Sequence, residues 1–485
     1  MPERRVRAGR DRPDLVGAGH GGAPPEDDAR GAEGQKHQAE ERRYAASKGL
    51  HTFADARRPD WATLRRVRQL SVVDAIGLGI NGIVGSGIYL LVAPLAVVAG
   101  RGSVAGVLLC AGVCSLIALS FAELASMYDD SGGPYLYARD AFGRWVAFGV
   151  GWLGAVLGVL GLAAVSAGFA VALTRFLPSL AGVRTWVAVA LIALLGLINY
   201  RGVKSGARAS TFLSVAKIVP LALLAIAGLA HAPKAHLTFE LHGAVRAAFL
   251  SIFMMSGFEW SAVPAGEFRN PRTQIPIALV SSLAIAACIY AALQTGALAV
   301  LPDVAQRQHP LPDLAEALFG PWAGRAINVA ALVSMAGFCA GVALAVPRYF
   351  TALARDGHLP QALTAQSRFG TPGTSILASA LGAGALAIVL GFRELVDVSN
   401  VVILSGYALS CAACLVLRVR RPETVRRVRL PLGPVIPLCA MLASIALLVS
   451  ARPGFKELRF AAVLLSIGFA AWGATALAGK RRAPG

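Results

Sequence analysis

Hydrophobic residues along this chain gather into long runs that polar segments separate. A helix needs about 20 apolar residues to cross the hydrocarbon core of a bilayer. Runs of this kind occur at residues 72–99, 104–127, 145–172, 186–200, 210–230, 243–266, 276–301, 324–347, 373–391, 398–417, 433–451 and 459–478. The pattern predicts an all-α polytopic membrane protein with 12 transmembrane helices.

The first run carries an interruption. Gly79, Gly82, Gly85 and Gly87 fall close together in its middle, and each glycine costs about 1 kcal/mol against alanine inside a helix. A break at membrane depth is tolerated only where the freed N–H and C=O groups face protein, water or a ligand. We therefore expect a buried site here. Close helix packing through small residues is the alternative interpretation.

A second interruption lies in the sixth run, where Gly257 stands between Ser256 and Glu259. Each interruption opens a block of five runs, and the odd number places the two blocks in opposite orientations. Paired broken helices at corresponding places of two halves are typical of a transporter binding site. The sequence thus predicts a 5+5 inverted repeat with broken helices 1 and 6.

Composition agrees with a membrane protein, since 56% of residues are hydrophobic, 15% are charged and the mean hydropathy is +0.60. The net charge of +19 does not indicate nucleic acid, because the basic residues concentrate in the N-terminal tail and in the segments expected inside. This bias predicts that both termini are cytoplasmic. We expect the basic cluster in residues 418–429 to face anionic lipid headgroups.

The chain divides into three parts. Residues 1–60 hold 12 basic and 11 acidic side chains and few aromatic ones, so we expect a disordered cytoplasmic tail. Residues 61–430 contain the first ten spans, after an amphipathic lead-in at Trp61–Leu70. Residues 431–485 contain the last two spans and a cytoplasmic C-terminus.

Several strings in this order resemble permeases of the amino acid-polyamine-organocation superfamily. They are GSGIY from Gly85, FAELASMY from Phe121, SGGPYLYARDAFG from Ser131, SGFE from Ser256, GEFRNPRTQIPIAL from Gly266 and RYFTALARDGHLP from Arg348. The resemblance implies a leucine-transporter-type fold and a secondary active transporter of amino acids in the cell membrane. It implies no cofactor.

The same resemblance assigns substrate contacts to both interruptions. Backbone N–H groups of Ser86, Gly87 and Ile88, next to Gly85, would hold the substrate carboxylate. Carbonyl groups of Ile83, Phe253 and Ser256, next to Gly257, would hold its ammonium group. The Phe253 ring would cover the substrate from outside. The chain departs from many relatives at Phe338-Cys339-Ala340, where they place an asparagine.

Two ionisable residues complete the predicted site. Glu259 matches a carboxylate that antiporters for arginine and polyamines use in substrate recognition or proton sensing. Lys217 matches a lysine that proton-coupled members carry where sodium-coupled relatives bind a cation. A lysine buried at this depth can exchange a proton during a transport cycle, whereas its alternative is to extend the ammonium toward the inner interface. We therefore expect the proton as coupling ion.

Helix electrostatics support a zwitterionic substrate independently of the resemblance. A half-helix starting near Ile88 directs about +0.5 charge at the site, and a half-helix ending near Met255 directs about −0.5 charge. At 4 Å and an effective dielectric constant of about 20, each end contributes roughly 2 kcal/mol. Together the two ends supply about the free energy of millimolar binding.

Other functions are weighed against the same residues. A primary pump needs a phosphate-binding GxxxxGK[ST] loop, which is absent, and a metalloenzyme needs a ligand cluster such as HExxH, which is also absent. We therefore expect no enzyme and no metal site. A polyamine or cationic amino acid antiporter stays open because of Glu259, and so does a non-transporting sensor or a channel.

Overall fold

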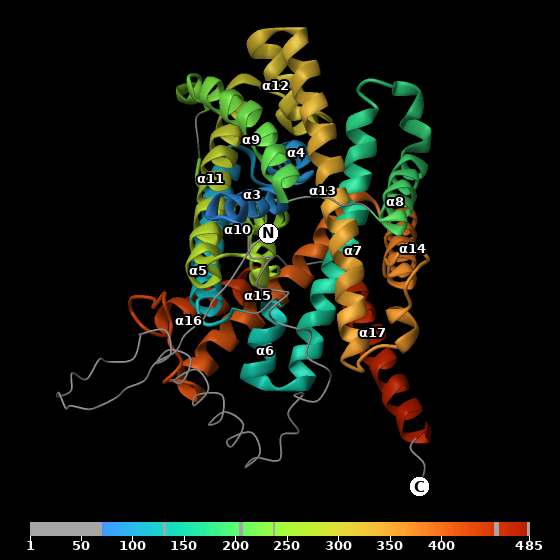
Figure 1. Cartoon of the computed structure of the whole chain (residues 1–485). Helices are drawn as coiled ribbons and strands as arrows, with labels where there is room; N and C mark the ends of the chain where they lie inside the picture. Colours follow the sequence, from blue (N-terminus) through green and yellow to red (C-terminus); the bar gives the residue numbers. More distant parts are fainter. Residues whose placement is uncertain (1–69, 130–131, 203–206, 236–237, 451–454, 483–485) are drawn as a thin grey trace, which may run out of the picture. The chain divides into compact units, whose positions relative to one another are not determined.

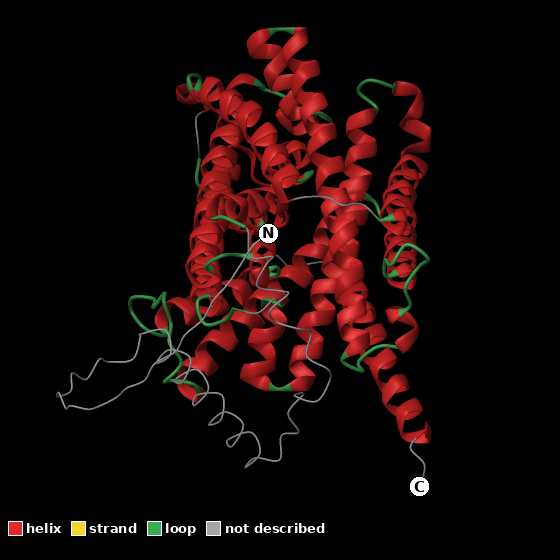
Figure 2. Cartoon of the chain, in the orientation of Figure 1, coloured by secondary structure: helices red, strands yellow, loops and turns green. Residues whose placement is uncertain are grey.

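The computed structural model describes residues 70–129, 132–202, 207–235, 238–450 and 455–482. The predicted tail 1–60 and nearly all of the amphipathic lead-in lie outside these residues. The described part is helical, and its extended backbone amounts to one isolated bridge between Leu70 and Phe268 (Figure 2). The all-α class predicted from the sequence is confirmed.

The α-helices follow one another along the chain with short connections (Figure 1). They are α3 (Val72–Ile83), α4 (Gly87–Ala99), α5 (Ser103–Ala125), α6 (Pro134–Phe142), α7 (Arg144–Leu173), α8 (Arg184–Arg201), α9 (Ala207–Leu229), α10 (Leu241–Met255), α11 (Pro271–Val300), α12 (Pro310–Phe319), α13 (Pro321–Arg355), α14 (Gly373–Val389), α15 (Phe392–Arg420), α16 (Val435–Ser450) and α17 (Phe455–Arg482).

Eight helical segments of the described chain are long and apolar enough to cross a membrane. They are Gly87–Ala125, Arg144–Leu173, Pro178–Arg201, Leu241–Ala262, Pro271–Val300, Pro321–Arg355, Phe392–Arg420 and Leu458–Leu477. Four further apolar helical stretches are shorter, namely Val72–Ile83, Ala216–Leu229, Gly373–Val389 and Val435–Ser450. Every predicted run overlaps one of these segments, while twelve crossings and the inverted repeat stay predictions.

Both predicted interruptions are present. α3 ends at Ile83 and α4 begins at Gly87, so three residues separate the two halves of the first run. α10 ends at Met255, and Gly257 turns the chain at φ +110° into the short 3-10 helix η5 (Phe258–Ala262). That left-handed conformation favours glycine, because a Cβ atom makes it strained.

The interrupted helices lie among the other helices (Figure 1). α3 packs against α9, α11 and η5, while α4 packs against α10. α7 and α13 pack along each other beside them, and small residues allow the close approach: a Cβ added to Gly158 would lie 2.2 Å from Cγ2 of Val346. The helices therefore surround the breaks with packed side chains.

Candidate functional site

A small cavity lies where the two interruptions meet. It has ≈ 30 Å³ of space that a water-sized sphere can enter. Its lining consists of Gly82, Ile83, Gly85, Ser86, Gly87, Leu157, Gly158, Gly161, Val165, Phe253, Ser256, Gly257, Trp260, Phe338, Val342 and Ile403. All of these are uncharged, and the polar side chains among them are two serines and one tryptophan.

The structure brings together most of the residues that the sequence assigned to substrate binding. Ile83, Gly85, Ser86, Gly87, Phe253, Ser256 and Gly257 all line the cavity. Ile88 and Glu259 do not line it. Ile88 is buried within the first turn of α4, and Glu259 is buried in η5 behind the second interruption.

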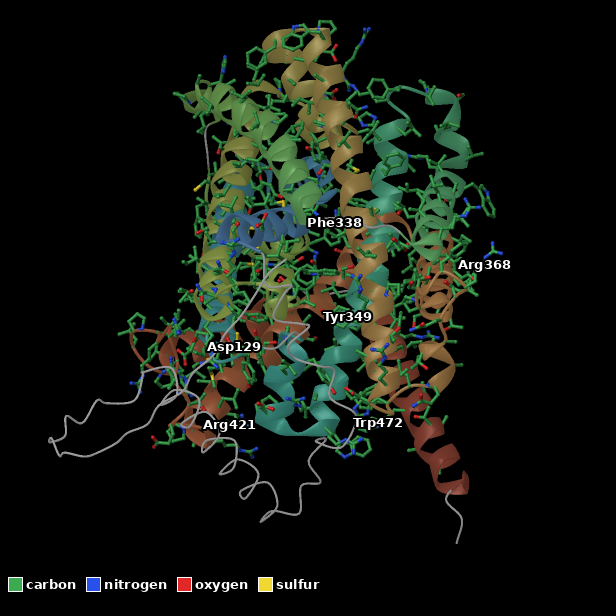
Figure 3. All side chains as sticks on the ribbon, in the orientation of Figure 1. Asp129, Phe338, Tyr349, Arg368, Arg421 and Trp472 are labelled. Atoms are coloured by element: carbon green, nitrogen blue, oxygen red, sulfur yellow. The ribbon has the colours of Figure 1, made fainter. Side chains whose placement is uncertain are left out.

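Other helices complete the cavity lining, and of their residues the sequence analysis named only Phe338, as part of a departure from relatives. α7 supplies Leu157, Gly158, Gly161 and Val165, α13 supplies Phe338 and Val342, and α15 supplies Ile403. Figure 3 labels Phe338 on α13, beside the interrupted helices. The glycine spacing of α7 was a usable signal, since small residues in a span allow backbone close to a ligand or another helix.

Three glycines of the breaks have different surroundings. A Cβ on Gly87 would lie 2.5 Å from Cβ of Met254, so this glycine serves the packing of α4 on α10. A Cβ on Gly82 would lie 2.4 Å from the carbonyl oxygen of Gly257, so the two breaks touch through their backbones. At Gly85 the nearest atom would be Cδ2 of Phe338 at 3.5 Å, an ordinary contact. Only at Gly85, of these three, is there room for a methyl group.

Helix ends give the cavity its electrostatic character. The N-terminus of α4 begins at Gly87 with Ser86 as its cap, and the Ser86 side chain makes no capping hydrogen bond. The C-terminus of α10 ends at Met255. Both Ser86 and Ser256 line the cavity, so opposite partial charges of about half an electron face the same small space. This arrangement suits a zwitterion.

Glu259 stabilises the second interruption through hydrogen bonds. Its Oε2 atom accepts hydrogen bonds from the backbone N–H of Gly257 at 2.9 Å and from the hydroxyl of Tyr407 on α15 at 2.8 Å. Its other oxygen, Oε1, is buried and has no hydrogen-bond partner in the described chain. The carboxylate thus fixes the turn at Gly257 and ties it to α15.

Lys217 stabilises the first interruption through hydrogen bonds. The side chain is 1% exposed on α9, and its Nζ donates to Oδ1 of Asn81 and to the carbonyl of Val84 at 3.3 Å. Ser334 on α13 donates its hydroxyl to the same Val84 carbonyl at 3.1 Å. Two neighbouring helices therefore hold one freed carbonyl of the break.

Two of the carbonyls assigned to the substrate ammonium already have donors. The Ile83 carbonyl accepts the N–H of Gly85 at 3.0 Å and the hydroxyl of Tyr290 at 3.4 Å. The Phe253 carbonyl accepts the hydroxyl of Ser256 at 3.1 Å. A carbonyl has two lone pairs, so an ammonium group at Ile83 would have to displace one of these donors.

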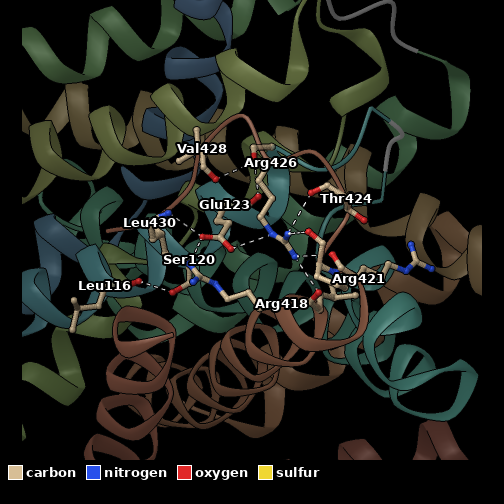
Figure 4. A network of polar contacts seen from close by, with 12 residues as sticks. Leu116, Ser120, Glu123, Arg418, Arg421, Thr424, Arg426, Val428 and Leu430 are labelled. Atoms are coloured by element: carbon tan, nitrogen blue, oxygen red, sulfur yellow. Dashed lines mark hydrogen bonds and ion pairs between the residues drawn. The ribbon is translucent and has the colours of Figure 1, made fainter. Parts of the chain in front are cut away.

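A second polar centre lies at the end of α5, away from the cavity (Figure 4). Glu123 is 1% exposed and pairs with Arg418 on α15 and with Arg426, whose Nε lies 3.4 Å from Oε1 of Glu123. The backbone N–H of Leu430 donates to Oε2 of Glu123 at 3.1 Å. Two of the arginines expected at lipid headgroups therefore pair inside the protein, and they fix the segment after α15 onto α5.

Comparison with known proteins identifies the family of the chain. A family model described as amino acid permease matches residues 70–471. A transporter of Mycobacterium tuberculosis, named as uncharacterized, is 30% identical over 85% of this chain and 92% of its own length. The branched-chain amino acid permease BcaP of Bacillus subtilis is 27% identical over 79% of this chain and 88% of its own length. A polyamine transporter of Oryza sativa subsp. japonica is 30% identical over 72% of this chain and 66% of its own length.

The names of these relatives indicate transport rather than catalysis, and the apolar helices agree with a multi-pass membrane protein. The family match covers both interruptions and the helices that line the cavity. This chain therefore belongs to the amino acid permease family, within the amino acid-polyamine-organocation superfamily.

Proposed function

We propose that this permease carries a neutral amino acid with a small or aliphatic side chain across the cytoplasmic membrane, by proton-coupled symport. The observation that carries the proposal is the uncharged cavity between the N-terminus of α4 and the C-terminus of α10. A zwitterion satisfies both helix ends, whereas a charged side chain finds no partner among the lining residues.

In this proposal the substrate carboxylate binds the backbone N–H groups at Ser86, Gly87 and Ile88. Ile88 contributes only through its backbone, which is consistent with its side chain lying outside the cavity lining. The ammonium group binds carbonyls at Phe253 and Ser256, and it replaces the Ser256 hydroxyl that donates to the Phe253 carbonyl in the structure. The Phe253 ring, half-buried beside Phe392, covers the substrate.

Lys217 is the proposed coupling residue. A charged Lys217 holds the Val84 carbonyl, so loss of its charge weakens one of the two hydrogen bonds that fix the first interruption. This weakening would let α3 move relative to α9 and α13, as an opening inner gate requires. In this proposal both termini are cytoplasmic, and the proton enters with the substrate.

An antiporter for polyamines or cationic amino acids is the second candidate. The unpartnered Oε1 atom of Glu259, which lies two residues after Gly257, favours it, as does the polyamine transporter among the relatives. Against it stands the position of Glu259 outside the cavity lining, with its other oxygen held by Gly257 and Tyr407.

A thermal-shift screen of the purified full-length protein against all amino acids and common polyamines separates the two candidates. A ligand at 100 times its dissociation constant stabilises the folded state by about 2.7 kcal/mol, which is a clear rise in melting temperature. We expect neutral aliphatic amino acids to stabilise both the wild type and Glu259→Gln. Stabilisation by polyamines or arginine alone, lost in Glu259→Gln, would favour the antiporter instead.

A further inference from the structure

A groove runs between α8 and α14 on the outside of the helices, and it shares no lining residue with the cavity at the two interruptions. Its volume is ≈ 740 Å³. The two helices contact each other directly and lie side by side in Figure 1. The groove floor contains Ile192, Gly196, Ala380 and Gly384, and its walls contain Leu197, Leu377 and Leu381.

The long part of the groove is apolar. Leu197, Leu377 and Leu381 are 49%, 59% and 64% exposed, although each lines the groove. In a membrane protein such a face meets lipid chains rather than water. The lining on α8 runs from Val189 to Tyr200, about 16 Å of helix, which is close to one leaflet of a hydrocarbon core about 30 Å thick.

One end of the groove is polar and positively charged. Tyr200, Gln366, Ser367 and Thr374 line that end. Arg201, at the end of α8, and Arg368 are their neighbours in the sequence. Both arginines are exposed, and neither has an ion-pair partner in the described chain. Figure 3 shows Arg368 projecting away from the helices. On the predicted topology this end faces the cytoplasm.

The polar end is structurally fixed. The hydroxyl of Thr371 donates to the carbonyl of Tyr200 at 2.8 Å, and the Tyr200 and Phe369 rings meet edge to face at 6.2 Å. The Arg368 guanidinium lies 4.8 Å from the Phe369 ring centroid. The two arginines are therefore carried by segments that are tied to each other, and the lining contains no acidic side chain to compete for them.

We propose that this groove binds an anionic phospholipid of the inner leaflet, with one acyl chain between α8 and α14 and the phosphate held by Arg201 and Arg368. The length of the apolar part matches an acyl chain in a single leaflet. The two unpaired cations select an anionic headgroup, because basic pockets between helices on the cytoplasmic side attract such lipids.

Native mass spectrometry of the purified full-length protein tests the proposal, with phosphatidylglycerol and phosphatidylcholine of identical acyl chains as probes. We expect phosphatidylglycerol to bind more tightly. The double variant Arg201→Gln/Arg368→Gln should weaken phosphatidylglycerol binding about 25-fold, because each basic residue contributes about a five-fold gain in affinity. Arg184→Gln, at the opposite end of the same helix, is the matched control and should change nothing.

A second variant tests the groove itself. A Cβ added to Gly384 meets no atom within 4 Å, and Gly384 lines the groove, so the side chain of Gly384→Leu would occupy groove space. It should lower the affinity for phosphatidylglycerol at least about tenfold. Gly112→Leu on α5, where a Cβ also meets no atom within 4 Å, is its control. If Gly384→Leu fails to fold, Ala385→Phe fills the same groove from an exposed position.

Three results would overturn the proposal. Equal affinity for the two lipids would remove the role of the arginines. Unchanged phosphatidylglycerol binding in folded Gly384→Leu would place the lipid elsewhere. A dimer that Gly384→Leu dissociates would show that a second copy of the chain occupies the groove.

Discussion

Gly82 and Gly257 touch through their backbones at the point where the two interrupted helices cross. A Cβ built on Gly257 would lie 2.2 Å from the carbonyl oxygen of Gly82, and one built on Gly82 would lie 2.4 Å from the carbonyl oxygen of Gly257. The two breaks are therefore one structural unit, although Gly82 and Gly257 are 175 positions apart in the sequence. Each break positions the other, and the cavity exists beside this contact.

Replacing Gly257 by alanine should destabilise the fold. The residue stands at φ +110°, a conformation that costs a non-glycine residue about 1–3 kcal/mol, and the added methyl group would also meet the Gly82 carbonyl. Thermal unfolding in detergent should show a lower melting temperature for Gly257→Ala and no decrease for Gly112→Ala, whose Cβ enters open space. Equal melting temperatures would refute the backbone contact.

Replacing Glu123 by glutamine should be costly because it removes a buried carboxylate that pairs with two half-buried guanidinium groups. Breaking a buried ion pair from one side costs about 3–5 kcal/mol. We expect a large fall in melting temperature for Glu123→Gln. The control is Asp303→Asn, which removes one of the two carboxylates that pair with Arg307 near the surface and should change stability little. Similar melting temperatures for the two variants would mean that Glu123 does not fasten the segment after α15.

Removing the Lys217 ammonium should uncouple transport from the pH gradient. In proteoliposomes, wild-type uptake should respond to an imposed pH gradient without sodium. Lys217→Ala should exchange substrate but lose that response. Ser334→Ala removes the other donor to the Val84 carbonyl without removing an ionisable group, so it should keep the response. A wild type that follows a sodium gradient and ignores pH would contradict the role of Lys217.

The sequence predicted the helical class and both interruptions because their signals are local. The glycines beside Ser86, and Gly257 itself, lie within apolar runs and mark the two breaks. This signal does not depend on how the helices pack. Seven of the residues that the resemblance assigns to substrate binding line the cavity.

The remaining features depend on contacts between distant segments. Nothing near Gly87 in the sequence shows that it packs on Met254, and nothing near Glu259 shows that Tyr407 occupies its oxygen. The positive-inside pattern explains why arginines follow α15, but it cannot show that Arg426 turns inward onto Glu123. Such pairings follow from the packing of α5, α10 and α15, which apolar periodicity leaves undefined.

The central claim is that an amino acid binds in the cavity where the two breaks meet. Counterflow of a labelled neutral aliphatic amino acid into proteoliposomes loaded with the unlabelled compound tests it most directly, with Gly85→Ala beside the wild type and Gly112→Ala as control. A methyl group at Gly85 fits the fold but takes space from the cavity, and one methylene in a pocket changes affinity about 10- to 200-fold. We predict transient accumulation in the wild type and in Gly112→Ala, and a loss of at least about tenfold in apparent affinity in Gly85→Ala at an unchanged melting temperature. Equal counterflow in all three proteins, or none in a folded wild type with any amino acid, would contradict the claim.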